Sequence, residues 1–236
     1  KRKYDLLLTA RSEGLLKEAC NELQSAYAIT CHYLAVDLAA PGAAKQVADW
    51  CITGHYPLAV LVNNAGYGVS GKLEEHSLEA HTAMMTVNME VPVSLCRYLL
   101  PVLQQQSKSY ILNIASSAAY QSVPGLNVYA ASKAFMLSFS RGLRQEYKKN
   151  NVVVSCICPG ATDTNFVNQA TLGEKARKMA DKVNMKPGDV AATAVRGMFA
   201  GKAEMVPGLI NKLGLFLTWL LPKSVLEKGA MRIYEP

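Results

Sequence analysis

Residues 58–66 read LAVLVNNAG, an apolar run that passes directly into a polar turn ending in glycine. Uninterrupted apolar residues over 58–62 are typical of a β-strand that is buried on both faces. The change to Asn63 and Asn64 puts polar side chains just past the carboxyl end of that strand. The pattern therefore predicts a buried strand whose end carries a candidate binding loop.

The same alternation extends in both directions along the chain. Apolar runs predict further strands at 4–9, 30–36, 110–115 and 152–157, and amphipathic segments predict helices at 12–27, 41–51, 80–103 and 129–149. Nearly continuous apolar strands separated by helices predict a parallel sheet covered on both faces, which is a doubly wound α/β fold. Ser12 is the expected cap of the first helix.

Composition restricts the class of protein. The chain has 236 residues, of which 50% are hydrophobic and 18% charged, so a disordered chain is excluded. No repeat or Pro/Ser-rich linker divides it, and we expect one domain over 1–236. The net charge of +7 would suit a polyanion, a membrane surface or a phosphorylated small molecule. It is spread along the chain without a basic stripe, which argues against nucleic-acid binding.

The cysteines and histidines form no metal-ligand pattern. The six cysteines include no CxxC pair, and the four histidines lack zinc-ligand spacing. We therefore expect no metal site and reduced, buried cysteines in a cytoplasmic protein. The N-terminus reads as a strand rather than a signal peptide. The longest apolar run, LGLFLTWLL at 213–221, is about half of what a membrane-spanning helix needs.

Polar clusters follow the predicted strands. They are residues 10–12, Asp37, NNAG at 63–66, Ser116 with Ser117, and PGATDT at 159–164. In doubly wound sheets, ligands bind outside the carboxyl ends of the strands. We therefore expect these clusters to line one site.

Tyr129 and Lys133 are the candidate chemical pair. Their spacing of four residues puts them on one face of a helix. A phenol is a poor acid or base at neutral pH, but a nearby ammonium favours the phenolate, so the pair could exchange a proton with a carbonyl/alcohol couple. Exposed pairs of this kind are also common on helices. Ser116, thirteen residues earlier, could hydrogen-bond the substrate oxygen, although a turn or capping role is open to it and Ser117 competes.

Together these motifs resemble the short-chain dehydrogenase/reductase family. The resemblance rests on NNAG at 63–66, VN at 87–88, IASSAA at 114–119, YAASK at 129–133 and PGATDT at 159–164. It covers residues 4–164 well and continues weakly to about 200. It implies a Rossmann-like fold, a homodimer or homotetramer, and a substrate-side region over 165–236.

The resemblance also implies roles for the catalytic residues. Tyr129 would be the acid/base, and Lys133 would lower its pKa and hold the nicotinamide ribose. Ser116, rather than Ser117, matches the serine that orients the substrate carbonyl. Asn88 matches the asparagine that supports a water in a proton relay, while the alternative is a helix-interior polar residue satisfied by the backbone.

Cofactor contacts are implied in the same way. Asn64, Ala65 and Gly66 would line the adenosine half of the cofactor, Pro159, Gly160 and Thr162 its nicotinamide end, and Thr164 the carboxamide or diphosphate. Enzymes of this fold that use NAD commonly carry an acidic residue at the end of the second strand. Here Ala10 is followed by Arg11 and Ser12, and Arg suits a phosphate. We therefore expect NADP(H), with Asp37 beside the adenine, although Arg11 could be only a surface charge.

One family motif, the glycine-rich turn TGxxxGxG, has no counterpart in these residues. The chain starts at what matches the family's second strand, so the resemblance predicts a further strand, turn and helix of about 30 residues. Such a unit could be disordered or removed by processing. A protein without it is the least expected alternative, because a missing central strand would leave an apolar gap and two unpaired edges.

The region after PGATDT would select the substrate. Residues 165–182 read as a helical segment near the site, and 209–221 are strongly apolar with Lys212 and Lys223 alongside. The apolar segment could pack on the core or a neighbouring subunit, or form a lid or a peripheral membrane contact. We expect an NADP(H)-dependent oxidoreductase acting on a hydrophobic ketone such as an oxoacyl, steroid or lipid-like compound. The rival hypothesis is an inactive cofactor-binding or scaffold protein.

Overall fold

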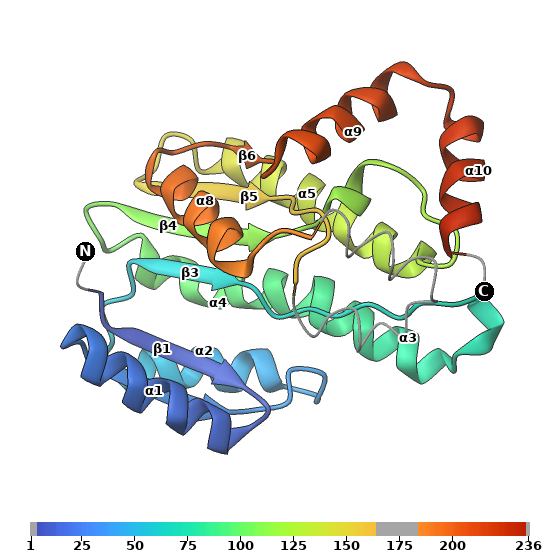
Figure 1. Cartoon of the computed structure of the whole chain (residues 1–236). Helices are drawn as coiled ribbons and strands as arrows, with labels where there is room; N and C mark the ends of the chain where they lie inside the picture. The colour runs from blue at the N-terminus through green and yellow to red at the C-terminus, as the bar shows by residue number, and fades with distance from the viewer. Residues whose placement is uncertain (1–3, 164–183, 235–236) are drawn as a thin grey trace.

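The strands of the computed structural model are all parallel, as the sequence predicts (Figure 1). The structure describes residues 4–163 and 184–234. The strands are β1 (Leu6–Ala10), β2 (Cys31–Ala35), β3 (Val60–Asn63), β4 (Ser109–Ile114), β5 (Val152–Ile157) and β6 (Glu204–Met205). Each of the five predicted strands is present, and the short β6 is an addition.

The helices follow the predicted alternation with one interruption. They are α1 (Glu13–Tyr27), α2 (Ala43–Thr53), α3 (Leu78–Met85), α4 (Val91–Leu103), α5 (Asn127–Glu146), α8 (Pro187–Phe199), α9 (Leu209–Leu220) and α10 (Lys223–Tyr234). Two 3₁₀ turns, η1 (Leu73–Glu75) and η3 (Ser117–Tyr120), lie in loops. The single helix predicted over 80–103 is instead α3 and α4 joined by a π-helical turn, η2 (Thr86–Glu90).

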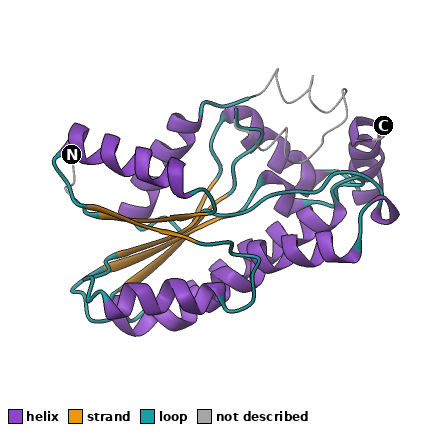
Figure 2. Cartoon of the chain, turned by 90° about the horizontal axis from the view of Figure 1, so that it is seen from below, coloured by secondary structure: helices purple, strands orange, loops and turns teal. Residues whose placement is uncertain are grey.

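Helices cover both faces of the sheet β3–β4–β5–β6 (Figure 2). Helices α4 and α5 contact β4 from one face, and α8 contacts β4 and β5 from the other. The strand residues between them are mostly apolar, and Ile111, Val154 and Ile157 are fully inaccessible. This packing of helices on both faces of the sheet fixes the carboxyl ends of β4 and β5, where two of the predicted polar clusters lie.

The sheet is divided into two parts among the described residues. β1 pairs only with β2, while β3 is the edge of the larger sheet. Between them lies a cleft of about 1620 Å³, lined on one side by Leu6–Ala10 and on the other by residues 60–63. Val62, in the wall of this cleft, is 49% exposed. β1 and β3 therefore face each other with backbone groups that no described strand pairs.

This division predicts a contrast in amide hydrogen exchange. In a protein made of residues 1–236 alone, amide protons of β1 and β3 should exchange with solvent faster than those of β4, since β4 is hydrogen-bonded on both edges and the other two strands on one. Exchange followed by mass spectrometry with peptides covering the three strands tests it. Equal protection of β3 and β4 would contradict the divided sheet.

Candidate active site

Helix α5 brings Tyr129 and Lys133 onto its inward face. The helix begins at Asn127, directly after a turn in which Gly125 has a φ of 82°, so Tyr129 lies in its first turn. Tyr129 and Lys133 are both buried, and Lys133 Nζ lies 5.8 Å from the centroid of the Tyr129 ring. The predicted proximity of the pair is confirmed, and neither side chain is on the exposed face of the helix.

The Lys133 ammonium is buried, and no carboxylate of residues 4–163 or 184–234 pairs with it. Its Nζ donates a hydrogen bond to the carbonyl oxygen of Ile114, at 3.1 Å. Burial lowers the pKa of Lys133 to about 8, against a weaker opposing effect of the Cys156 and Cys158 thiols. An ammonium has further N–H donors beyond the one used here. Lys133 therefore retains donors that a bound hydroxyl or phenol oxygen could accept from.

Gly66 closes the approach of the NNAG loop to Lys133. A Cβ at this position would lie 3.0 Å from Asn88 Oδ1 and 3.1 Å from Lys133 Nζ, which is tighter than an ordinary contact. Any larger residue would push against a buried amine and a clamped amide. The loop after β3 and the middle of α5 are therefore in contact at Gly66 and Lys133. We expected the polar clusters after the strands to lie together in this way.

Asn88 lies in the π-turn η2 and is fully buried. Its Oδ1 accepts a hydrogen bond from the Tyr67 N–H at 3.1 Å, and its Nδ2 donates to the Tyr67 carbonyl at 2.9 Å and to Ser132 Oγ at 3.0 Å. The side chain amide therefore clamps the loop after NNAG to α5. Two of the three hydrogen bonds go to backbone groups, but these belong to the loop after β3, and the place of Asn88 in a proton relay stays a prediction. Single π-turns are frequent at functional sites.

Ser116 follows β4 and caps the 3₁₀ turn η3. Its Oγ accepts a hydrogen bond from the Ala118 N–H at 3.1 Å, so its hydroxyl proton remains available for donation. The capping role and a substrate-orienting role are therefore compatible. Ser117 lies in the same loop, and its N–H donates to the Pro159 carbonyl at 2.8 Å. That bond joins the loop after β4 to the loop after β5.

A second anchor of this loop has no signature in the sequence. The Tyr120 hydroxyl donates to Glu204 Oε1 at 2.6 Å, and Arg141 Nη1 donates to Glu204 Oε2 at 2.9 Å. The three residues come from η3, β6 and α5. Because they are far apart in the chain, only the tertiary structure reveals the link.

A buried polar chain lies beneath the site. Asn63 Nδ2 donates to Asn113 Oδ1 at 2.8 Å, and Asn113 Nδ2 donates to Ser140 Oγ at 2.8 Å. Asn63 and Asn113 are register partners on β3 and β4. The sequence signal was available, since Asn113 interrupts an otherwise apolar strand. Asn63 Oδ1 is buried and has no partner among the described residues, and Asn63 lines the cleft.

The predicted adenosine-side residues line the same cleft. They are Arg11, Asp37, Asn64, Ala65 and Gly66. Burial raises the pKa of Tyr67, and the Arg11 guanidinium and Asp37 carboxylate act on it in opposite directions, so both charges lie near its ring.

Ser12 is at the N-cap position of α1, but its side chain makes no capping hydrogen bond. The predicted capping by its hydroxyl is therefore wrong. Its backbone is extended, as is usual at an N-cap, and its carbonyl accepts the first helical bond, from the Leu16 N–H.

The predicted nicotinamide-side residues lie at the end of β5. Thr162 Oγ1 donates to the Gly160 carbonyl at 3.1 Å, and Pro159 accepts the bond from Ser117. The Gly160 backbone lies against Asn211 of α9, with no room for a side chain. Thr164 and residues 165–182 lie outside the described residues. Among residues 4–163 and 184–234, no group of His, Cys, Asp and Glu side chains could hold a metal ion.

Comparisons with known sequences agree with this geometry. The family model of short chain dehydrogenases matches residues 1–175. An uncharacterized oxidoreductase of Staphylococcus saprophyticus is 30% identical over 190 residues, covering 80% of this chain and 78% of that protein. The very-long-chain 3-oxoacyl-CoA reductase of Rattus norvegicus is 34% identical over 168 residues, covering 67% of this chain. This chain spans about half the length of that reductase, 52%.

Solved structures share the fold. A short-chain dehydrogenase from Sphingobium yanoikuyae in complex with NADPH aligns with a TM-score of 0.80 at 22% identity, covering 98% of this chain and 86% of that one. One from Burkholderia phymatum in complex with NAD aligns with a TM-score of 0.79 at 21% identity, covering 90% and 83%. At these identities the likeness concerns the fold alone.

The buried amine predicts a pH dependence of stability. The pKa of Lys133 is about 8 in the folded protein against an ordinary 10.5. Between these values the unfolded chain binds more protons, so the free energy of unfolding rises with pH. Relative to Lys133→Met, the wild type should gain up to about 3 kcal/mol across that window.

Urea unfolding of both proteins at several pH values measures this difference, and groups that do not interact with Lys133 cancel from it. A difference that stays constant with pH would contradict the lowered pKa.

Proposed function

Because this chain belongs to the short-chain dehydrogenase family, we propose that it is an NADP(H)-dependent oxidoreductase that reduces a hydrophobic ketone. The observation that carries the proposal is the buried Tyr129–Lys133 pair beneath the meeting point of the loops after β3 and β4. An uncompensated ammonium next to a phenol is costly for folding and useful for proton transfer. A purely structural pair would be more stable with a carboxylate in place of the phenol.

Each side chain has a distinct task in the proposed reaction. Tyr129 donates a proton to the substrate oxygen, and the adjacent Lys133 charge favours the phenolate that results. Ser116 donates a hydrogen bond to the same oxygen from the η3 cap. Asn88 acts by holding the Tyr67 loop against α5, and thereby keeps Gly66 and Lys133 in place. The bound cofactor supplies the hydride.

The residues present suit a nicotinamide cofactor. The remaining donors of Lys133 suit ribose hydroxyls, and the glycine at 66 lets a ligand approach the amine. Arg11 lies beside the start of α1, whose first backbone N–H groups are not engaged by the Ser12 side chain. A guanidinium next to a helix N-terminus favours a phosphate, which supports NADP(H) over NAD. Solved structures with this fold include one complex with NADPH and one with NAD.

A hydrophobic oxoacyl-type ketone is the proposed substrate class. The support is twofold: the relative from Rattus norvegicus is named for a very-long-chain 3-oxoacyl-CoA substrate, and α9, which contacts the site loops, is almost wholly apolar.

The cleft between β1 and β3 bears on cofactor binding. The strand that the family resemblance predicts could pair with both of these edges, and the glycine-rich turn after it would hold the diphosphate at the carboxyl ends of the strands. In our proposal, cofactor affinity depends on this space being filled. The arrangement of the catalytic residues on α5, β4 and β5 does not depend on it.

Removing the Tyr129 hydroxyl should abolish turnover. Tyr129→Phe keeps the ring and its packing but loses the proton donor, so kcat for NADPH-dependent ketone reduction should fall by at least about a hundredfold. Tyr27→Phe, on the exposed face of α1, is the matched control. Equal rates for wild type and Tyr129→Phe would overturn the mechanism. Ser116→Ala should also lower kcat, while Ser117→Ala should leave it unchanged. A fall in kcat for Ser117→Ala alone would assign the orienting role to Ser117 instead.

Neutralising Arg11 should change cofactor preference. Arg11→Ala removes a charge-assisted contact to a phosphate, so kcat/KM for NADPH should fall by about ten- to a hundredfold. kcat/KM for NADH should change little, because NADH lacks that phosphate. The ratio of the two values, measured with one ketone at fixed ionic strength, is the readout, and an unchanged ratio would mean that Arg11 is only a surface charge.

A further inference from the structure

Helix α9 presents an unusually large apolar surface. None of its residues is buried, and its outward side chains are exposed leucines, an isoleucine, a phenylalanine and a tryptophan. They are Leu209, Ile210, Leu213, Phe216, Leu217, Trp219 and Leu220, which we call the α9 face. Contiguous exposed apolar patches of this kind mark a site of interaction rather than ordinary surface. Packing of α9 into the core of its own chain, one alternative from the sequence, is not what the structure shows.

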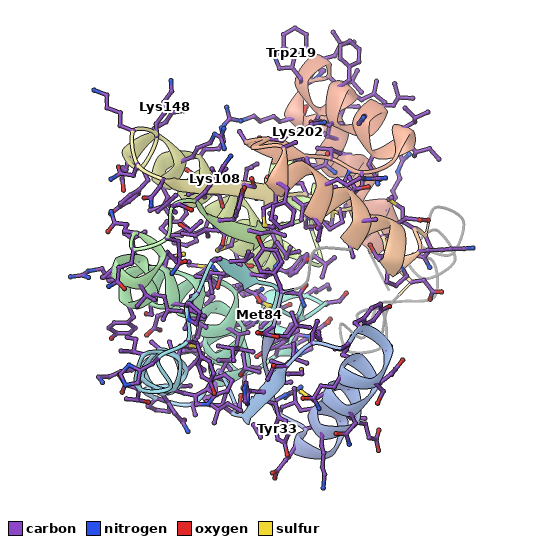
Figure 3. The ribbon with its side chains drawn as sticks, turned by 90° about the vertical axis from the view of Figure 1, so that its left-hand side faces the viewer. Tyr33, Met84, Lys108, Lys148, Lys202 and Trp219 are labelled. Carbon is purple, nitrogen blue, oxygen red and sulfur yellow. The ribbon has the colours of Figure 1, made fainter. Side chains whose placement is uncertain are left out.

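The α9 face points away from the molecule. Successive helical residues are about 100° apart, which puts Leu209, Leu213, Phe216 and Leu220 within about 60° of one another. The opposite side holds the half-buried Asn211 and Thr218, and α9 contacts η3 there. Figure 3 shows Trp219 projecting beyond the rest of the molecule. The helix therefore rests on the active-site loops by one side and offers the other to an outside partner.

The charged side chains of α9 and α10 are mostly cationic, with Glu227 of α10 as the exception. Helix α9 contains no acidic residue, and its single charged side chain is Lys212. Exposed Lys223, Lys228 and Arg232 follow on α10. Within the part of the chain that the structure describes, none of these four cations forms an ion pair. An apolar face bordered by unpaired cations complements an anionic lipid surface.

The position of Lys212 decides between a membrane and a protein partner. On the helical wheel it falls between Phe216 and Trp219, inside the apolar face. In a dry protein interface an ammonium there would be desolvated without a carboxylate on this helix to pair with, which is costly. At a bilayer surface its aliphatic stem can lie along the apolar side chains while the ammonium reaches lipid phosphates. A tryptophan beside it is also typical of the membrane–water boundary.

We propose that the α9 face docks on the surface of a bilayer containing anionic lipids, with Lys212 and the α10 cations contacting the headgroups. Of the described residues, none forms a helix long and apolar enough to cross a membrane, so α9 lies in the interface plane. Docking puts η3 and the loop at Gly160 next to the lipid. The inference stands on α9 itself and is independent of the reaction proposed above.

The chain offers an internal reporter of docking. It has two tryptophans, Trp50 on α2 and Trp219. In Trp50→Phe, the remaining Trp219 is 80% exposed, so its fluorescence should shift to shorter wavelength when vesicles of phosphatidylcholine and phosphatidylglycerol are added. In Trp219→Phe, the remaining Trp50 should show no shift. The shift should weaken in pure phosphatidylcholine and at high salt.

Flotation with the same vesicles tests the face directly. Leu213→Glu should lower the vesicle-bound fraction at least about tenfold, whereas Leu15→Glu, on an equally exposed leucine of α1, should leave it unchanged. Circular dichroism confirms that both variants fold. The proposal is overturned if the folded wild type stays with the buffer, or if both variants bind equally. It is also overturned if light scattering shows a dimer that Leu213→Glu dissociates while no vesicle binding occurs.

Discussion

The organisation of the site depends on one buried ammonium group, that of Lys133. It is held by a backbone carbonyl at the end of β4 and by no carboxylate in the part of the chain that the structure describes, and burial lowers its pKa to about 8. Desolvation of an unpaired cation opposes folding, so the surrounding structure has to compensate for it. The compensation explains why the neighbourhood is so tightly arranged: there is no room for a side chain at position 66, and the Tyr129 ring lies alongside.

Three polar links hold the elements around this amine. Asn88 ties the loop after β3 to α5, the Asn63–Asn113–Ser140 chain ties β3 and β4 to the same helix, and Glu204 ties η3 to α5 through Tyr120 and Arg141. All three converge on α5, which carries the candidate acid/base. Apart from the exposed Arg141–Glu204 pair, these bonds are buried or half-buried, and losing one partner would leave the other unsatisfied. Several independent links therefore fix α5, and with it the position of Tyr129. A group that transfers a proton needs such a fixed position.

The sequence predicted the parts of the fold that local patterning controls. Apolar runs located β1 to β5 within a few residues, and the four-residue spacing located Tyr129 and Lys133 on one face. It missed features that depend on distant contacts. The π-turn at Asn88 has the same apolar periodicity as the helices that flank it, and Glu204 lies in a strand of two residues. The capping of α1 by Ser12 failed because a capping residue type permits the bond without requiring it, and the site of Ser116 was found by motif order rather than by any property of a lone serine.

The divided sheet separates the two halves of the site energetically. β1 and β2 are not isolated, because Leu7 and Leu34 pack in one apolar cluster with Val47 of α2 and with Val91 and Leu95 of α4. The cation and the polar links, by contrast, all rest on β3 to β6 and α5. A structural change in the cleft should therefore displace Arg11 and Asp37, which line it from the β1–β2 side, more than Tyr129. The proposed cofactor contacts and the proposed proton donor thus lie in different parts of the chain. The bonds from Asn88 to Tyr67 are one link between them, and the apolar cluster shared by β1, β2, α4 and Leu61 of β3 is another.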